Sequence, residues 1–131
     1  MTTVNIAAAS SIIGTTTYLT PSVTTAVVLL NNTATSAAVY KINQIVAANV
    51  NGTSAVDTTV SIYSNGAQTQ GNAPSSGTAY PIVSTVSVPP DASLVAVDKT
   101  TAIYLMEGQS ITVTSGTASG ITYSISYEII S

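Results

Sequence analysis

The alternation of apolar and polar residues over Ile121–Ile130 is the feature that most constrains what this chain can fold into. Every second side chain there is Ile or Tyr, and the positions between them carry Thr, Ser or Glu. Successive side chains of a strand point to opposite faces, so the alternation predicts a strand with one face in a core. A second β signal spans residues 103–113, where Gly108 is the natural corner because glycine tolerates a positive φ.

The composition favours an all-β fold. The 131 residues include 22 Thr and 18 Ser, but only two Lys and five Asp or Glu, and there is no Arg, His, Cys, Trp or Phe. Thr, Val, Ile and Tyr suit a pleated sheet, whereas the usual helix formers are scarce. A chain of this length can bury one core without disulfides, so we expect a single domain over residues 1–131.

We expect a two-sheet antiparallel sandwich, jelly-roll-like, with about eight to ten strands and no significant helix. Besides the two signals above, the expected strands cover residues 4–8, 12–18, 23–30, 38–50, 57–64, 81–88 and 93–97. Helix competes for residues 38–50, but Asn43, Asn49 and the β-branched residues favour a strand. That strand and residues 57–64 are expected to form a hairpin.

Several strands carry finer expectations. Gly14 predicts a bulge or a close backbone approach in its strand. Residues 23–30 are apolar on both faces, so the core should cover one face and a neighbouring subunit or segment the other. Residues 65–79 read as a long flexible loop, either mobile or ordered by a partner. Along 38–50 simple alternation groups five side chains on one face: Tyr40, Ile42, Val46, Ala48 and Val50.

Few residues could carry catalysis, and we expect no enzyme. Triads that need His or Cys are excluded because the chain has neither. Lys41 and Lys99 could in principle activate a serine, but lysines in a strand and a turn are usually solvated. Glu107 and Glu128 are the least unlikely carboxylate pair for glycoside hydrolysis, although Glu128 falls on the outward face of the last strand.

We expect no metal site and no cofactor. Asp91 and Asp98 could offer oxygens to calcium, but that ion needs six to eight ligands and the sequence has no run of alternating aspartates. The simpler interpretation is that Asp91 caps a turn after two prolines and that Asp98 pairs locally with Lys99. No glycine-rich phosphate loop is present.

The charge balance argues against two classes of partner. A net charge of −3 with two lysines cannot displace counterions from a phosphate backbone, so we expect no nucleic acid. The longest apolar run, residues 26–30, is too short to span a bilayer, so we expect no membrane. The start Met1-Thr2-Thr3 lacks a basic region and a long apolar stretch, so no signal peptide is expected.

A surface with so few charges favours self-association. Charged side chains normally protect exposed strand edges, so their scarcity suggests that the edges are covered in a symmetric assembly. The aromatic residues are seven tyrosines, at positions 18, 40, 63, 80, 104, 123 and 127. Tyr123 and Tyr127 belong to the alternating core face, and the other five could pack in a sheet, line a subunit interface or stack on sugar rings.

The second half of the chain resembles a family of small structural proteins of tailed bacteriophages, particularly phages of marine bacteria and cyanobacteria. The features are Val88-Pro89-Pro90-Asp91-Ala92-Ser93-Leu94, Val97-Asp98-Lys99, Ile103-Tyr104-Leu105-Met106-Glu107-Gly108-Gln109-Ser110-Ile111 and Ser126-Tyr127-Glu128-Ile129. Upstream, residues 41–43 and 48–53 are also similar. Residues 105–111 are similar to a hairpin common in trimeric jelly rolls. The chain departs from the family in its loop at 67–77 and its low charge.

The resemblance implies a virion protein with no catalytic residues. The expected role is that of a head decoration or cement subunit on the outer surface of the capsid. We expect a homotrimer that contacts the major capsid protein or other virion proteins. Its synthesis is expected in the host cytoplasm. A neck, tail or fibre component is the nearest variant. The alternative is a receptor- or glycan-binding module that uses tyrosines and four amides: Asn31, Asn32, Gln68 and Gln70.

Overall fold

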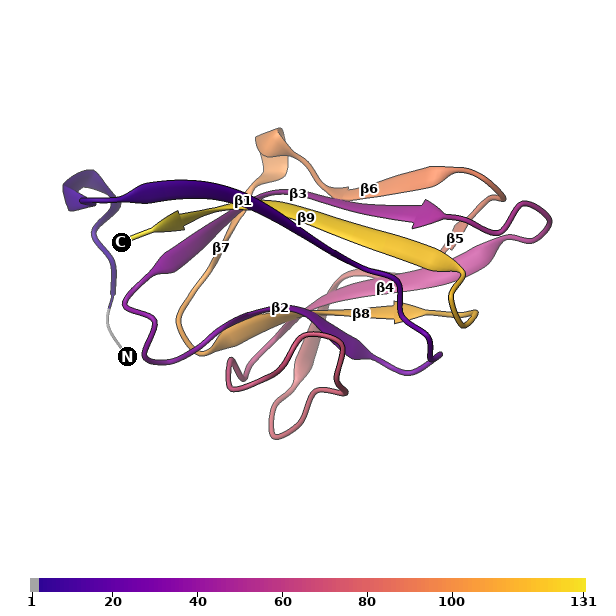
Figure 1. Ribbon diagram of the computed structural model, residues 1–131, viewed down its shortest axis with the longest axis horizontal. Coiled ribbons are helices and arrows are strands. Elements are labelled where there is room, and N and C mark those ends of the chain that lie inside the picture. Colours follow the sequence, from indigo (N-terminus) through magenta and orange to yellow (C-terminus); the bar gives the residue numbers. More distant parts are fainter. Residues whose placement is uncertain (1–2) are drawn as a thin grey trace.

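Nine strands build the part of the protein that the computed structural model describes, residues 3–131 (Figure 1). They are β1 (Ile12–Leu19), β2 (Val27–Asn32), β3 (Val39–Asn49), β4 (Val56–Tyr63), β5 (Ala79–Val88), β6 (Ser93–Val97), β7 (Ile103–Leu105), β8 (Gln109–Ser115) and β9 (Ile121–Ile130). The helical elements in this part are two 3-10 turns, Ile6–Ala8 and Lys99–Thr101. The all-β prediction is confirmed.

The strands form two antiparallel sheets that face each other (Figure 1). One sheet has the order β1-β9-β3-β6, with β7 also paired to β3, and the other has the order β2-β8-β4-β5. The pairs β4–β5, β3–β6, β2–β8 and β1–β9 are nested in the sequence, all centred near the loop that contains Gly71. The chain is thus one long antiparallel ribbon rolled into a sandwich, which is a jelly roll, as predicted.

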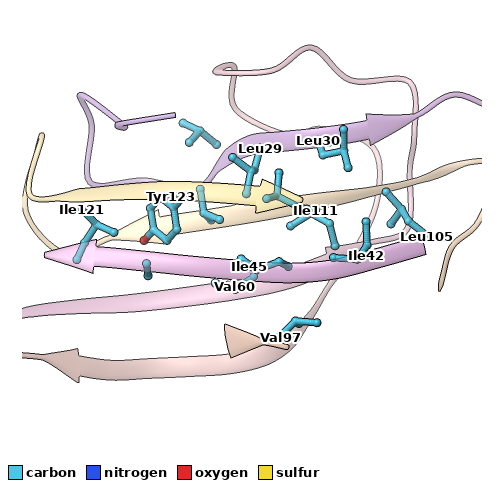
Figure 2. Packing of buried hydrophobic residues seen from close by; sticks show 14 of the residues in the cluster. Leu29, Leu30, Ile42, Ile45, Val60, Val97, Leu105, Ile111, Ile121 and Tyr123 are labelled. Atoms are coloured by element: carbon cyan, nitrogen blue, oxygen red, sulfur yellow. The ribbon is translucent and has the colours of Figure 1, made fainter. Parts of the chain in front are cut away.

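The core fills the space between the sheets (Figure 2). Ile121, Tyr123 and Ile125 of β9 are fully buried, as the alternation predicts, and Ile42 and Ile45 of β3 join them. The facing sheet supplies a matching set: Leu29, Val60, Ile111 and Val113. Burial of these branched side chains supplies the main driving force for the fold, because each contributes roughly 1.5–3 kcal/mol when removed from water.

The expected corner at Gly108 is present, but it does not close a hairpin. Gly108 has a φ of +78° and donates its N–H to the Asn32 carbonyl at 2.9 Å. β7 before it pairs with β3, whereas β8 after it pairs with β2 and β4. The turn therefore carries the chain from one sheet to the other, and the similarity of residues 105–111 to a hairpin is not reflected in the pairing.

A bulge in β3 corrects the face assignment made from simple alternation. The pairing of β3 with β9 shifts between Ile42 and Gln44, so Asn43 is an extra residue without a partner in the ladder. Beyond the bulge the inward side chains are Ile45, Ala47 and Asn49. Val46, Ala48 and Val50, which alternation placed on the same face as Tyr40 and Ile42, therefore lie on the opposite face, away from the core.

The predicted hairpin between residues 38–50 and 57–64 is wrong, because β3 and β4 lie in different sheets. The segment between them crosses the sandwich and is fixed by the buried Asn49. The amide nitrogen of Asn49 donates to the Ser54 and Val88 carbonyls, at 3.0 and 2.9 Å, and its oxygen accepts from the Asn51 N–H. These bonds pair polar backbone groups in a chain reversal, where no neighbouring strand is available to pair them.

The first thirty residues differ from expectation in three ways. Residues 4–8 form no strand. They contain the exposed 3-10 turn Ile6–Ala8, which Asn5 caps by accepting a hydrogen bond from the Ala7 N–H. Gly14 causes neither a bulge nor a close approach, because β1 pairs with β9 without a register shift and no atom lies near its missing Cβ. The next strand begins at Val27, four residues later than expected.

The loop at residues 65–79 packs against its own sandwich. Gly71 donates to the Val28 carbonyl at 2.8 Å, and the Val28 N–H donates to the Asn72 carbonyl at 2.9 Å. These backbone bonds cover the edge of β2. The side chains from Val27 to Leu30 are all buried within the single chain, so both faces of this strand are covered without a neighbouring subunit. Gln68 closes the loop on itself by donating to the Ser75 carbonyl at 2.7 Å.

Candidate functional site: a tyrosine pocket between the sheets

The charged residues considered for catalysis occupy structural positions. Glu128 lies opposite Lys41 across the β3–β9 ladder, on the face away from the core, and accepts a hydrogen bond from the Asn43 amide at 3.0 Å. Glu107 is buried in the corner between β7 and β8. No residue in these surroundings supplies a His or Cys partner, because the chain has none.

The two aspartates considered for calcium lie in turns. Asp91 occupies the turn after Pro89 and Pro90 with a φ of +56°. Asp98 caps the 3-10 turn at Lys99–Thr101, and its partners are Thr100 and Thr101 rather than Lys99. The hydrogen bonds from Thr100 hold the pKa of Asp98 below its usual range. Residues 3–131 contain no group of three or more His, Cys, Asp or Glu side chains that could hold a metal.

A pocket of about 370 Å³ lies where the edge strands β1 and β2 of the two sheets meet. Tyr40 of β3 and Tyr127 of β9 form one side, with ring centroids 5.3 Å apart and ring planes inclined by 32°. Leu29 and Leu30 of β2 form an apolar wall, and Figure 2 shows both among the core side chains. The polar lining comes from Thr17, Asn31, Thr33 and Gln70.

The long loop forms one wall of this pocket. Its Gln70 amide nitrogen donates to the Thr17 hydroxyl at 3.0 Å and more weakly to the Tyr18 carbonyl at 3.4 Å. The neighbouring Gly71 and Asn72 are bonded to Val28 of β2. The loop is thus held to the edge strands β1 and β2, and the side chain of Gln70 is fixed by its bond to Thr17.

Burial raises the pKa of the Tyr40 and Tyr127 hydroxyls, and in Tyr127 the neighbouring Tyr40 adds to the effect. Both phenols therefore stay neutral well above physiological pH. None of the side chains that line the pocket carries a charge. The pocket is accordingly a neutral, partly aromatic site whose polar groups are hydroxyls and amides.

Two of the four amides proposed for glycan contact line the pocket and two do not. Asn31 and Gln70 are in the lining. Asn32 is fully buried, and its amide nitrogen donates to the Leu105 and Ala38 carbonyls at 3.0 and 3.1 Å. Asn32 therefore fastens the corner near Gly108 and cannot meet a ligand. Gln68 is engaged within the loop.

The seven tyrosines fall into three groups. Tyr123 and Tyr63 are buried, and their hydroxyls bond to Thr114 and Gly77. Tyr40 and Tyr127 line the pocket, so Tyr127 is only partly in the core face assigned to it. The third group is exposed on edge strands: Tyr18, Tyr80 and Tyr104.

A second feature of the surface is the outer edge of β1. β1 pairs with β9 on one side and has no strand on the other within residues 3–131. Ile12, Ile13 and Tyr18 on this strand are 61%, 56% and 74% exposed. Apart from the contact of the loop residue Gln70 with Thr17 and Tyr18, the strand lacks the features that normally protect an edge, because it contains no charge, no proline and no bulge.

β5, one of the two edge strands of the other sheet, has two of these protections. β5 contains Pro81, its pairing with β4 is interrupted by two register shifts, and Thr85 has a φ of +50°. Proline removes a donor and the irregular backbone prevents regular pairing with another strand. Of these two edges, β1 is therefore the better suited to accept a partner.

The chain matches no protein-family model, no curated protein and no solved structure. In residues 3–131, no helix has the length and apolar character needed to cross a membrane.

Proposed function

We propose that the protein is a structural subunit that joins a larger assembly through the edge of β1. The observation that carries the proposal is the regular, uncharged and apolar edge of this strand in a chain that has almost no charge elsewhere. Such an edge offers unpaired backbone groups to a neighbouring chain, and the exposed side chains add apolar contact area.

The proposed form of the assembly is a homotrimer. An edge without charges suits a second copy of the same charge-poor chain, since neither copy brings a charge that would be left unpaired. A ring of three requires that β1 of one copy meets a different surface of the next, because self-matching contacts produce two-fold dimers. The contact energy comes from apolar area and backbone pairing, so it should depend little on salt.

The proposed location is the outer surface of a tailed-bacteriophage head, where the subunit would stabilise the major capsid protein as a decoration or cement protein. The resemblance of residues 86–130 to small phage structural proteins supports this location, and the jelly-roll fold is compatible with it. A neck, tail or fibre component is the same proposal with another neighbour. The absence of His, Cys and Arg from the sequence also favours an assembly role over catalysis.

The capsid role can be tested with particles assembled with and without the protein. Particles that lack it are expected to open at a lower temperature than complete ones. When the salt is diluted, they should also open earlier, at a salt concentration that complete particles still withstand. Added purified protein should restore their resistance. Ile12→Lys protein should restore less, because it places a charge on the β1 edge. Equal resistance of both kinds of particle would contradict the capsid role.

A further inference from the structure

The pocket holds polar groups that have no partner within the protein. In the described residues 3–131, the Tyr40 and Tyr127 hydroxyls and the side-chain amide of Asn31 make no hydrogen bond. Elsewhere in the protein, side chains of the same types do make hydrogen bonds, as those of Tyr123, Tyr63 and Asn32 show. Polar groups that line a concave site and remain available are those that fix the orientation of a ligand.

The chemistry of the lining selects a class of ligand. The absence of charge disfavours phosphates, carboxylates and amines, because their charge would be buried without a partner. A purely apolar ligand would in turn leave the Tyr and Asn groups without hydrogen bonds. A ligand with one apolar face and several neutral hydroxyls matches both sides, and a pyranose ring has this character: its C–H face packs on aromatic rings and its edge carries hydroxyls.

We propose that the tyrosine pocket binds a neutral sugar, one pyranose unit either free or at the end of a glycan. Tyr40 and Tyr127 contact the ring and bond to its hydroxyls, Asn31 bonds at the rim, and Leu29 and Leu30 exclude water from the opposite side. Gln70, held by Thr17, forms the loop wall and contributes its carbonyl oxygen. A volume of about 370 Å³ lies near the lower end of the range for ligand pockets and suits a single unit.

The test begins with an array of neutral mono-, di- and oligosaccharides, followed by calorimetric titration of the best ligand. Tyr40→Phe and Asn31→Ala each remove one hydrogen-bonding group while leaving the aromatic stack in place. Each should weaken binding about fivefold to tenfold, since one hydrogen bond contributes roughly 1 kcal/mol. Tyr80→Ala, which removes an exposed tyrosine outside the pocket, should leave affinity unchanged.

Three results would overturn the proposal. They are no binding of any neutral sugar by folded protein, binding confined to sulfated or sialylated glycans, and equal loss of binding on Tyr80→Ala and Tyr40→Phe. Thermal unfolding of each variant shows that the fold is intact. The proposed assembly role is measured separately by molar mass, so either proposal can fail while the other stands.

Discussion

The Tyr123 hydroxyl connects the two sheets through the core. It donates to the Thr114 carbonyl at 2.8 Å, and because its single proton is used there, the Thr58 hydroxyl must donate to the Tyr123 oxygen. Tyr123→Phe should lower the free energy of unfolding by about 1–3 kcal/mol, since both partners lose a buried hydrogen bond. Denaturant titration measures the change, with the exposed Tyr80→Phe as control. Equal stability of Tyr123→Phe and wild type would contradict this role.

Gly66 occupies a position that admits no side chain. A Cβ there would overlap the Asn32 carbonyl oxygen and lie 2.9 Å from the Gln109 nitrogen, so the backbone would have to move. Gly66→Ala should destabilise the protein by about 3 kcal/mol or more. Gly14→Ala, where the added methyl meets nothing within 4 Å, should change stability by less than about 0.5 kcal/mol. Similar melting temperatures for the two variants would refute the assignment.

Neighbouring residues of identical type can have opposite roles that the sequence does not reveal. Asn31 lines the pocket, whereas Asn32 is buried and bonded to backbone carbonyls. A run of polar turn-formers gave no reason to separate them. The register shift between Val28 and Leu30 changes which way the side chains at this end of β2 point. The shift is visible only in the pairing of β2 with β8.

The bulge at Asn43 makes an unusual prediction for β3. Removing Asn43 would leave Ile42, Gln44 and Ile45 in simple alternation, so the inward residues would stay inward. The deletion variant should therefore still fold and unfold cooperatively. Deletion of Ser124 from the regular strand β9 should prevent folding, because it turns half of that strand's core side chains outward. Circular dichroism and thermal melts distinguish the two, and an unfolded Asn43 deletion would contradict the account.

Strand existence was predictable and strand pairing was not. The sequence patterns located all nine strands approximately, and they added one strand, at residues 4–8, that the structure does not form. The expectation that strands adjacent in the sequence pair with each other was wrong for β3 and β4. In a rolled ribbon most pairing partners are far apart in the chain. The order of the sheets depends on these long-range contacts, which local pattern does not contain.

The pocket illustrates the same limit at the scale of the molecule. Thr17, Asn31, Tyr40, Gln70 and Tyr127 come from four strands and a loop and meet only because the ribbon is rolled. The sequence suggested tyrosines and amides as contact groups, but it could not select which of them converge.

The molecule as a whole should lose stability at alkaline pH. Burial raises the pKa of Tyr123 to about 12, against about 10 in the unfolded chain. The folded state therefore binds the proton more tightly, and the contribution is complete below about pH 10 and lost as the pH rises toward about 12. The loss from Tyr123 is on the order of 2 kcal/mol. Denaturant titrations across this window should show a smaller decrease for Tyr123→Phe. An identical decrease in both proteins would assign the effect elsewhere.

The central claim is that the edge of β1 joins subunits, and light scattering after size exclusion over a wide dilution range tests it most directly. The wild-type protein should have the molar mass of a trimer that survives dilution. Ile12→Lys, at a side chain that is 61% exposed, should shift it toward the monomer, whereas Thr24→Lys on an exposed bend adds the same charge away from the edge and should not. A wild-type protein that is monomeric at every concentration would contradict the claim.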